Sequence, residues 1–306
     1  MIVPLHLWVL LHTGATLSAS RFSVHASTVI GILALAALYE WRSRVHRRAG
    51  GEPLGRAKPT VLAIALITLF LSLNGWLHDL SDSYLFSAHM VQHLVLALVV
   101  APLLIMATPG WMLRPALASR PVNTVARWVT NPLRAFAIFN VVMAGWHLPP
   151  LYNLAMAHHN VHIVQHLMFL VAAVLMWWPI LSPLPELPRL AYPLQMLYLF
   201  LMSIPMSIVA VYIAYANSVL YPAYATAPRI WGISPMQDQL IGGLIMWIPG
   251  GLLFYVVMTV VFFKWAGRDS DTTAGAQVDW RPPRPTLPVS RPQPSVTVRQ
   301  DRSSSL

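Results

Sequence analysis

Residues 84–107 read YLFSAHMVQHLVLALVVAPLLIMA and contain no Asp, Glu, Lys or Arg. A helix needs about 20 mostly apolar residues to cross the hydrocarbon core of a membrane, so this stretch is long enough to span one. The whole chain shares its character, because 57% of the 306 residues are hydrophobic and only 10% are charged. Soluble domains carry about 25% charged residues. The composition therefore predicts an integral membrane protein and excludes a soluble enzyme, a secreted disulfide scaffold and a mostly disordered chain.

Further apolar stretches accompany this one and predict an all-α integral membrane protein with about seven transmembrane helices. The expected spans cover residues 24–41, 59–78, 84–107, 132–152, 159–180, 192–215 and 236–264. The chain then divides into an N-terminal apolar segment (1–20), a seven-helix transmembrane domain (21–265) and a disordered, Pro/Arg-rich cytoplasmic tail (266–306). For the N-terminal segment we expect an interfacial or re-entrant helix, with an eighth span or a signal peptide as alternatives.

The basic residues predict the orientation of these spans. All Lys and Arg residues except Arg21 and Arg229 fall on one side of the expected bundle. Lys and Arg accumulate in cytoplasmic loops, so we expect the N-terminus outside and the C-terminus in the cytoplasm. The basic residues of the cytoplasmic side account for the net charge of +10. We therefore expect the protein to contact membrane lipid and to have no nucleic-acid partner.

The histidines form a pattern that random placement would not produce. Of 12 His, only His46 falls on the basic side. The word H-x-x-Q-H-L occurs at 89–94 and again at 162–167, and the related words GWLH (75–78) and GWHL (145–148) precede them. Residues i, i+3 and i+4 share one face of a helix, so each word presents two imidazoles and an amide on a single stripe. We therefore expect an internal two-helix repeat whose histidine stripes lie at equal depth.

Such paired imidazoles are typical of a metal site. The chain has no Cys, so a metal must be held by His, Met, carboxylate or amide groups. The expected metal ligands are His89, His93, His162, His166, His78 and His147. The groups expected to support them are Gln92, Gln165, Met90, Met202, Met206, Asp79 and Asp82. Because a delivered ion must exchange ligands, we expect a partly solvated site.

Three alternatives stay open beside a bound copper ion. Two histidines from opposite helices could ligate a b-type haem, although each stripe offers two imidazoles where haem needs one from each side. A transporter would need polar groups through the inner halves of the spans, and LVLALVVAPLLI (94–105) has none. A structural bundle without ligand is the third alternative. No enzyme activity is expected, because Asp and Glu are nearly absent from the spans.

The sequence resembles a known family at these same words. The two H-x-x-Q-H-L stretches, GWHLPPLY at 145–152 and SPMQDQLIGGLIMW at 234–247 are similar to those of the CtaG family of cytochrome c oxidase assembly factors, over about residues 60–265. The resemblance implies a multi-pass protein of the bacterial inner membrane that matures a haem–copper oxidase by delivering copper. The implied partners are subunits of a cytochrome c oxidase and another copper chaperone.

Overall fold

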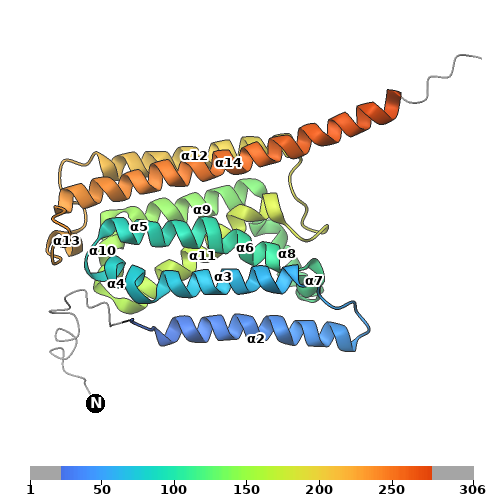
Figure 1. The fold of residues 1–306 in the computed structure, drawn as a ribbon, viewed down its shortest axis with the longest axis horizontal. Coiled ribbons are helices and arrows are strands. Elements are labelled where there is room, and N and C mark those ends of the chain that lie inside the picture. Colours follow the sequence, from blue (N-terminus) through green and yellow to red (C-terminus); the bar gives the residue numbers. More distant parts are fainter. Residues whose placement is uncertain (1–21, 278–306) are drawn as a thin grey trace, which may run out of the picture. The chain divides into compact units, whose positions relative to one another are not determined.

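The computed structural model describes residues 22–277, and the side chains of residues 22–268. Every regular element within these residues is a helix (Figure 1). The predicted N-terminal segment, 1–20, and residues 278–306 of the predicted tail lie outside the described residues. The helices are α2 (Ala26–Arg48), α3 (Ala57–Leu73), α4 (Gly75–Ser83), α5 (Phe86–Leu94), η1 (Val95–Val100), α6 (Ala101–Ala107), α7 (Gly110–Leu117), α8 (Arg120–Val129), α9 (Pro132–His147), α10 (Pro149–Ala157), α11 (His159–Leu181), α12 (Tyr192–Ala214), α13 (Pro222–Ala225) and α14 (Pro235–Gln277).

Five helical stretches in the described chain are long and apolar enough to cross a membrane. They are Ala57–Ser83, Phe86–Ala107, His159–Leu181, Tyr192–Ala214 and Pro235–Arg268. The other two expected spans, 24–41 and 132–152, are helical but do not qualify on length and hydropathy. In α2 the charged residues Glu40, Arg42 and Arg44 lie in the second half of the helix and dilute its apolar part. The predicted count of about seven spans is therefore not confirmed.

Prolines divide the predicted span 132–152 into two helices. Helix α9 has 16 residues and ends at His147, and Leu148 is extended with ψ 133° before α10 begins at Pro149. The ring of a proline disfavours the helical conformation of the preceding residue, so the helix breaks here. The predicted span 132–152 is thus two helices, and α9 alone is shorter than the roughly 20 residues that cross a bilayer.

A glycine bends the chain between α3 and α4. Asn74 is extended, and Gly75 has φ +66°, a left-handed conformation that costs glycine little. The same turn contacts the start of α2, because Asn74 Oδ1 accepts a hydrogen bond of 2.7 Å from the backbone N–H of His25. This corner therefore fixes His25 beside the beginning of α4.

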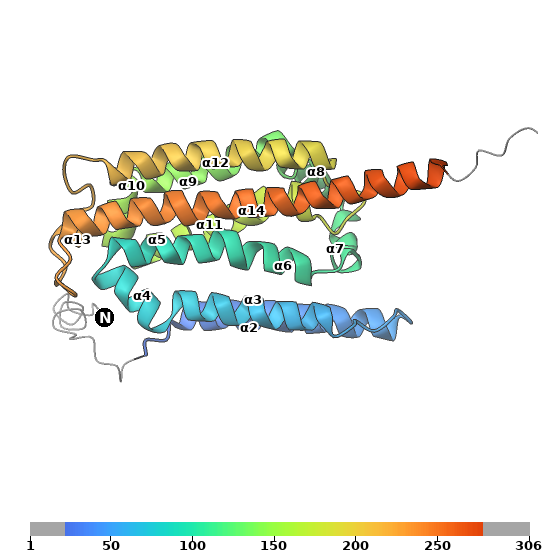
Figure 2. The same ribbon diagram turned by 45° about the horizontal axis from the view of Figure 1, so that its top comes forward.

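The helices run back and forth between two ends of the body formed by residues 22–265. Helices α4, α10 and α13 lie at the same end as the starts of α5, α11 and α14, and α7 and α8 lie at the other end (Figures 1 and 2). We call the first the histidine end, because it holds both H-x-x-Q-H-L words. Residues up to Trp265 form one compact unit, and α14 continues as a helix to Gln277, past the predicted start of the tail at 266. Helix α14 contains Pro249, and the next proline in the sequence is Pro282.

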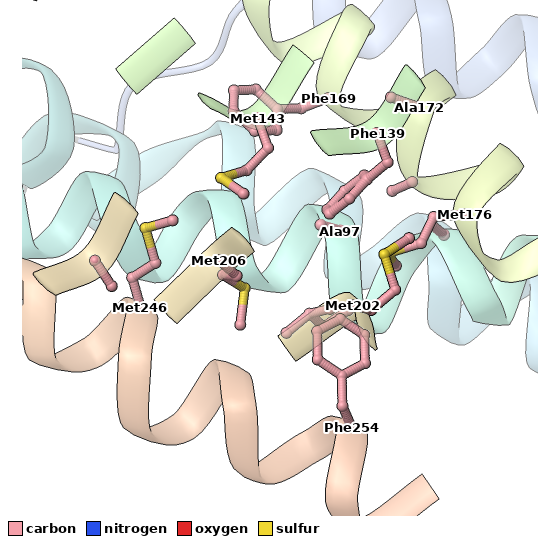
Figure 3. Packing of buried hydrophobic residues seen from close by; sticks show 14 of the residues in the cluster. Ala97, Phe139, Met143, Phe169, Ala172, Met176, Met202, Met206, Met246 and Phe254 are labelled. Carbon is pink, nitrogen blue, oxygen red and sulfur yellow. The ribbon is translucent and has the colours of Figure 1, made fainter. Parts of the chain in front are cut away.

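Away from the histidine end, toward the middle of the helices, the core is apolar and rich in methionine. Met143, Met176, Met202, Met206 and Met246 pack with phenylalanines from α9, α11 and α14 (Figure 3). Glycines let α14 approach this core closely, since a Cβ at Gly243 would collide with Ala214 of α12. Small residues permit such close packing of membrane helices.

One helix of this core departs from α geometry. The stretch Phe86–Ala107 is α5, η1 and α6 in succession, and η1 is a π-helix of 6 residues that begins directly after the first histidine word. The indole Nε1–H of Trp177 on α11 donates a 2.8 Å hydrogen bond to the carbonyl of Ala97 in η1. Wide turns of this kind are frequent at functional sites.

Candidate metal centre

The two histidine words face one another at the histidine end. Each lies near the start of a long helical stretch, Phe86–Ala107 or His159–Leu181, and each follows a short helix, α4 or α10. The ring centroids of His89 and His162 are 5.2 Å apart, and those of His93 and His166 are 5.3 Å apart. Residues 73 positions apart in sequence therefore form one cluster of imidazoles.

Three of these histidines form a compact triad. His89, His93 and His166 each offer a nitrogen, and the three nitrogens all lie within 4.8 Å of one another. The Nε2 atoms of His89 and His93 are 2.8 Å apart. Two imidazole nitrogens bound to one ion at 2.0–2.1 Å lie about 3 Å apart. A contact this short is a hydrogen bond with one proton between the two nitrogens, and the same spacing would suit two ligands of one metal ion.

A second set of ligands adjoins the triad and shares His89 with it. Asp82, His89 and His162 also have ligand atoms within 4.8 Å of one another. The Nδ1 atom of His162 lies 3.6 Å from Oδ2 of Asp82. The cluster thus offers an all-nitrogen position and, next to it, a position with one carboxylate oxygen.

Tyr224, on α13, determines which nitrogen of His89 faces the triad. Its hydroxyl donates its single proton to the carbonyl of Ser81 at 2.6 Å, so its oxygen must accept from Nδ1–H of His89 at 3.0 Å. The proton of His89 is then on Nδ1, and the lone pair of Nε2 points to His93. Such hydrogen bonds to metal-binding histidines fix the tautomer and the orientation of the ring.

Burial keeps Tyr224 in the protonated form that this arrangement requires. Desolvation raises the pKa of Tyr224 well above its usual value. Tyr152 supports it with a contact of 3.0 Å between the two hydroxyls. Because the one proton of Tyr224 goes to Ser81, Tyr152 is the donor in that pair.

His78 lies in the cluster and has one of its two nitrogens hydrogen-bonded. Its Nδ1 accepts a hydrogen bond of 3.3 Å from Nε2 of Gln92, which also donates to the carbonyl of Ser72 at 2.7 Å. Its Nε2 lies 3.2 Å from Oδ2 of Asp82, within ion-pair distance but without hydrogen-bond geometry. The structure therefore places His78 and Gln92 around the triad, with Nε2 of His78 next to Asp82.

Two other predicted residues lie beside the triad with polar atoms unpaired. Nδ1–H of His147 donates to the carbonyl of Met143 at 2.6 Å, and its buried Nε2 has no partner in the described chain. The His147 ring is 5.8 Å from that of His93, and His147 belongs to neither ligand set. Gln165, fully buried on α11, likewise has no partner for its side-chain oxygen or nitrogen.

The remaining predicted residues are not brought to the triad. Asp79 accepts a hydrogen bond from Ser23. Met202 and Met206 pack in the apolar core of Figure 3, and Sδ of Met202 accepts a hydrogen bond from Asn140. Met90 is in the same core cluster, with 1% of its surface exposed. These three methionines thus serve as packing residues.

The expectation of a partly solvated site is wrong. His89, His93 and His166 have exposed fractions of 0%, 5% and 8%, and the ring nitrogens His93 Nδ1 and His166 Nε2 are buried without a hydrogen-bond partner. Burying an unpaired polar group costs about 1–3 kcal/mol. Nε2 of His166 is therefore a buried nitrogen that a bound cation would satisfy, whereas Nδ1 of His93 belongs to a ring whose Nε2 already faces His89.

Sequence reasoning missed the residues that hold the first word in place. The carboxylate of Asp238, fully buried on α14, accepts from the backbone N–H groups of Phe86 and Ser87 at 2.7 and 3.0 Å, which caps the start of α5. A lone acidic residue at the beginning of an apolar helix was the signal for Asp238. Nothing in the sequence around Tyr224 indicated its contact with His89, because 135 residues separate the two.

Comparison with known proteins is consistent with this picture. The sequence profile of the cytochrome c oxidase caa3 assembly factor family (Caa3_CtaG) matches residues 7–268. Uncharacterized proteins of Mycobacterium bovis and Mycobacterium tuberculosis are each 26% identical over 244 residues, and one of Mycobacterium leprae is 24% identical over 243 residues. These alignments cover 74% of this chain and 36% of each relative, so the chain matches about a third of their length. No solved structure shows a significant match.

Proposed function

Because this chain belongs to the cytochrome c oxidase caa3 assembly factor family, we propose that it is a copper metallochaperone. It binds a copper ion at His89, His93 and His166 and delivers it to a haem–copper oxidase during assembly. The observation that carries the proposal is the triad itself, three buried imidazoles with nitrogens within 4.8 Å of one another. The copper is cargo and leaves with the oxidase.

The chemistry of the ligands favours copper. Imidazole suits copper, zinc, iron and nickel, and among divalent ions copper binds most tightly to a given nitrogen site. The chain has no Cys, so it contains no thiolate that could be oxidised or that could bind zinc in competition with copper. The neighbouring position with Asp82 offers a harder oxygen ligand, which suits the oxidised ion better than the reduced one.

Haem is the alternative cofactor, and the spacing of the triad favours a bare ion. Two axial imidazoles on opposite faces of a haem iron have nitrogens about 4 Å apart, twice the usual metal–nitrogen distance. The pairs that face each other from opposite helices, His89 with His162 and His93 with His166, have ring centroids 5.2 and 5.3 Å apart. An iron between two such rings would hold their centroids about 6 Å apart, so these pairs lie too close together for a haem between them.

The proposed location follows from the basic residues. We place the protein in the bacterial inner membrane, with the histidine end and the N-terminus outside and the C-terminus in the cytoplasm. The copper would then pass to subunits of a cytochrome c oxidase at the outer face, after arriving from another copper chaperone. In each case a short helix, α4 or α10, precedes a long helical stretch whose first turns carry the histidine word, and this order supports the duplicated two-helix unit.

Metal content tests this proposal directly. Copper, iron and zinc are measured per chain after gentle detergent purification and reconstitution with Cu(I), for the wild type and for His93→Ala/His166→Ala. We expect about one copper per wild-type chain and loss of it in the double variant. The matched control is His158→Ala, an exposed histidine that should leave copper content unchanged.

Three results would contradict the proposal. The first is iron at one per chain with a haem absorption band, which would establish the haem function instead. The second is a wild-type chain that binds no copper after reconstitution. The third is copper retained in His93→Ala/His166→Ala, which would exclude the triad as its site.

A further inference from the structure

A cavity connects the histidine cluster to the outside of the helical body. It has a volume of about 320 Å³ and lies between α2, α3 and α11. One end is lined by imidazoles, and the rest by apolar side chains such as Ile32, Leu69 and Leu170. The imidazoles of this end are His25, His78, His159, His162 and His166. The cavity therefore reaches a member of the triad, His166, from the side.

The exposure of these histidines falls in steps toward the triad. His159 is exposed and His25 is half-buried, whereas His162 and His166 are 6% and 8% exposed. The ring centroids are 6.0 Å apart for His25 and His159, and 4.3 Å apart for His162 and His166. Imidazoles thus lead from the mouth of the cavity to the buried site.

From this arrangement we propose that the cavity is the route by which a copper ion reaches and leaves the triad, with His25 and His159 as a capture site at its mouth. The inference rests on the proposed function of this same site. Two imidazoles on opposite sides of one ion have ring centroids about 6 Å apart, given metal–nitrogen distances of 2.0–2.1 Å. The pair at the mouth has this separation, and the buried Nε2 of His25 has no hydrogen-bond partner in the described chain.

The route continues through His162. Nε2 of His162 is buried without a hydrogen-bond partner in the described chain, as is Nε2 of His78, whose Nδ1 accepts from Gln92. His162 also shares the ligand set of Asp82 and His89. Each step exchanges one metal–ligand bond for another, and the ion ends among the three nitrogens of the triad without any change of oxidation state.

Other approaches to the triad are covered by aromatic rings. The ring of Tyr152 lies 5.3 Å from that of His89, and the ring of Phe169 lies 4.3 Å from that of His93. Helix α2, in contrast, has Ser43 as its one buried side chain among its described residues. Because so little of α2 is buried, this helix can move away from α11 and widen the mouth of the cavity.

The absence of Cys allows the cavity to be plugged at one chosen position. Gly31 lines the cavity, and a Cβ there would meet no atom within 4 Å, so Gly31→Cys fits without strain. The control is Gly55→Cys, whose Cβ also meets no atom within 4 Å and which does not line the cavity. Both variants of the full chain are labelled with a bulky maleimide in detergent, and the initial rate of Cu(I) uptake from a coloured chelator is measured.

We expect the labelled Gly31→Cys protein to take up copper about tenfold more slowly than labelled Gly55→Cys, with the same final copper content. The variant His25→Ala/His159→Ala should slow uptake and release alike and leave the equilibrium affinity unchanged, while His158→Ala changes neither rate. Equal uptake rates for the two labelled proteins would overturn the route. Lost affinity in His25→Ala/His159→Ala at unchanged rates would overturn the capture site. A wild type that takes up no Cu(I) would overturn the proposed function, and the route with it.

Discussion

Replacing Tyr224 with Phe removes one hydroxyl beside the proposed metal site. The hydroxyl contacts Sδ of Met156 at 3.8 Å and, more closely, the carbonyl of Ser81, Nδ1 of His89 and the hydroxyl of Tyr152, at 2.6, 3.0 and 3.0 Å. Only the bond to His89 acts on a proposed metal ligand, because it holds the proton on Nδ1. We therefore expect Tyr224→Phe to weaken copper binding while the copper content at saturation stays at about one per chain.

The size of this effect follows from the bonds lost. Groups that orient metal-binding histidines change metal affinity by about 10–100-fold, which corresponds to about 1.4–2.8 kcal/mol. A buried hydrogen-bonding group left without its partner costs about 1–3 kcal/mol, so the two estimates agree. The affinity is measured by competition with a Cu(I) chelator of known constant, and the stability by unfolding in a denaturing detergent.

Tyr221→Phe is the matched control for this prediction. Tyr221 and Tyr224 are 1% and 2% exposed, and the hydroxyl of Tyr221 donates to the carbonyl of His147 at 2.8 Å without contact to His89. This control should lower the free energy of unfolding by about 1 kcal/mol and leave copper affinity unchanged. Equal affinity losses in both variants, or none in Tyr224→Phe, would refute the tautomer argument.

Three further predictions concern the helices that carry the site. Asp238→Asn should lower the free energy of unfolding by about 1–2 kcal/mol in a detergent titration, because the carboxylate caps two backbone amides of α5; an unchanged midpoint would contradict it. Gly75→Ala should destabilise by about 1–2 kcal/mol through its φ of +66° and the collision of its Cβ with Phe22, measured in the same titration. Trp177→Phe should lower the free energy of unfolding by about 1 kcal/mol and raise the rate of amide hydrogen exchange around Ala97, whose carbonyl accepts a hydrogen bond from the indole. An unaltered exchange rate would show that η1 persists without this bond.

Much of the site was predictable because its residues repeat at helical spacing. The i, i+4 pairs His89–His93 and His162–His166 had to lie on one face of each helix, and the structure brings both faces together. The division of the predicted span 132–152 was also open to prediction, since Pro149 and Pro150 stand inside it. The hydropathy of the stretch does not indicate this break, because a proline interrupts a helix without making the stretch polar.

Other features could not be predicted from local sequence. The sequence named six histidines as ligands, and the structure brings His89, His93 and His166 into one triad, with His78 and His147 outside both ligand sets. It also named Met202 and Met206 as groups that support the ligands, whereas they lie in the apolar core. Spacing determines which residues share a helix face, but the rotation of that helix against its neighbours determines what the face contacts.

The amino-acid sequence by itself determined the class of this protein, the helical character of its spans and the histidine end. These follow from apolar length and helical period, which depend only on near neighbours in the chain. Only the tertiary structure decided which nitrogens converge, which tautomer His89 adopts, how deeply the triad is buried and where a cavity reaches it. Those properties depend on groups such as Ser81, Tyr224 and Asp238, which come from separate parts of the chain and meet only when the helices pack.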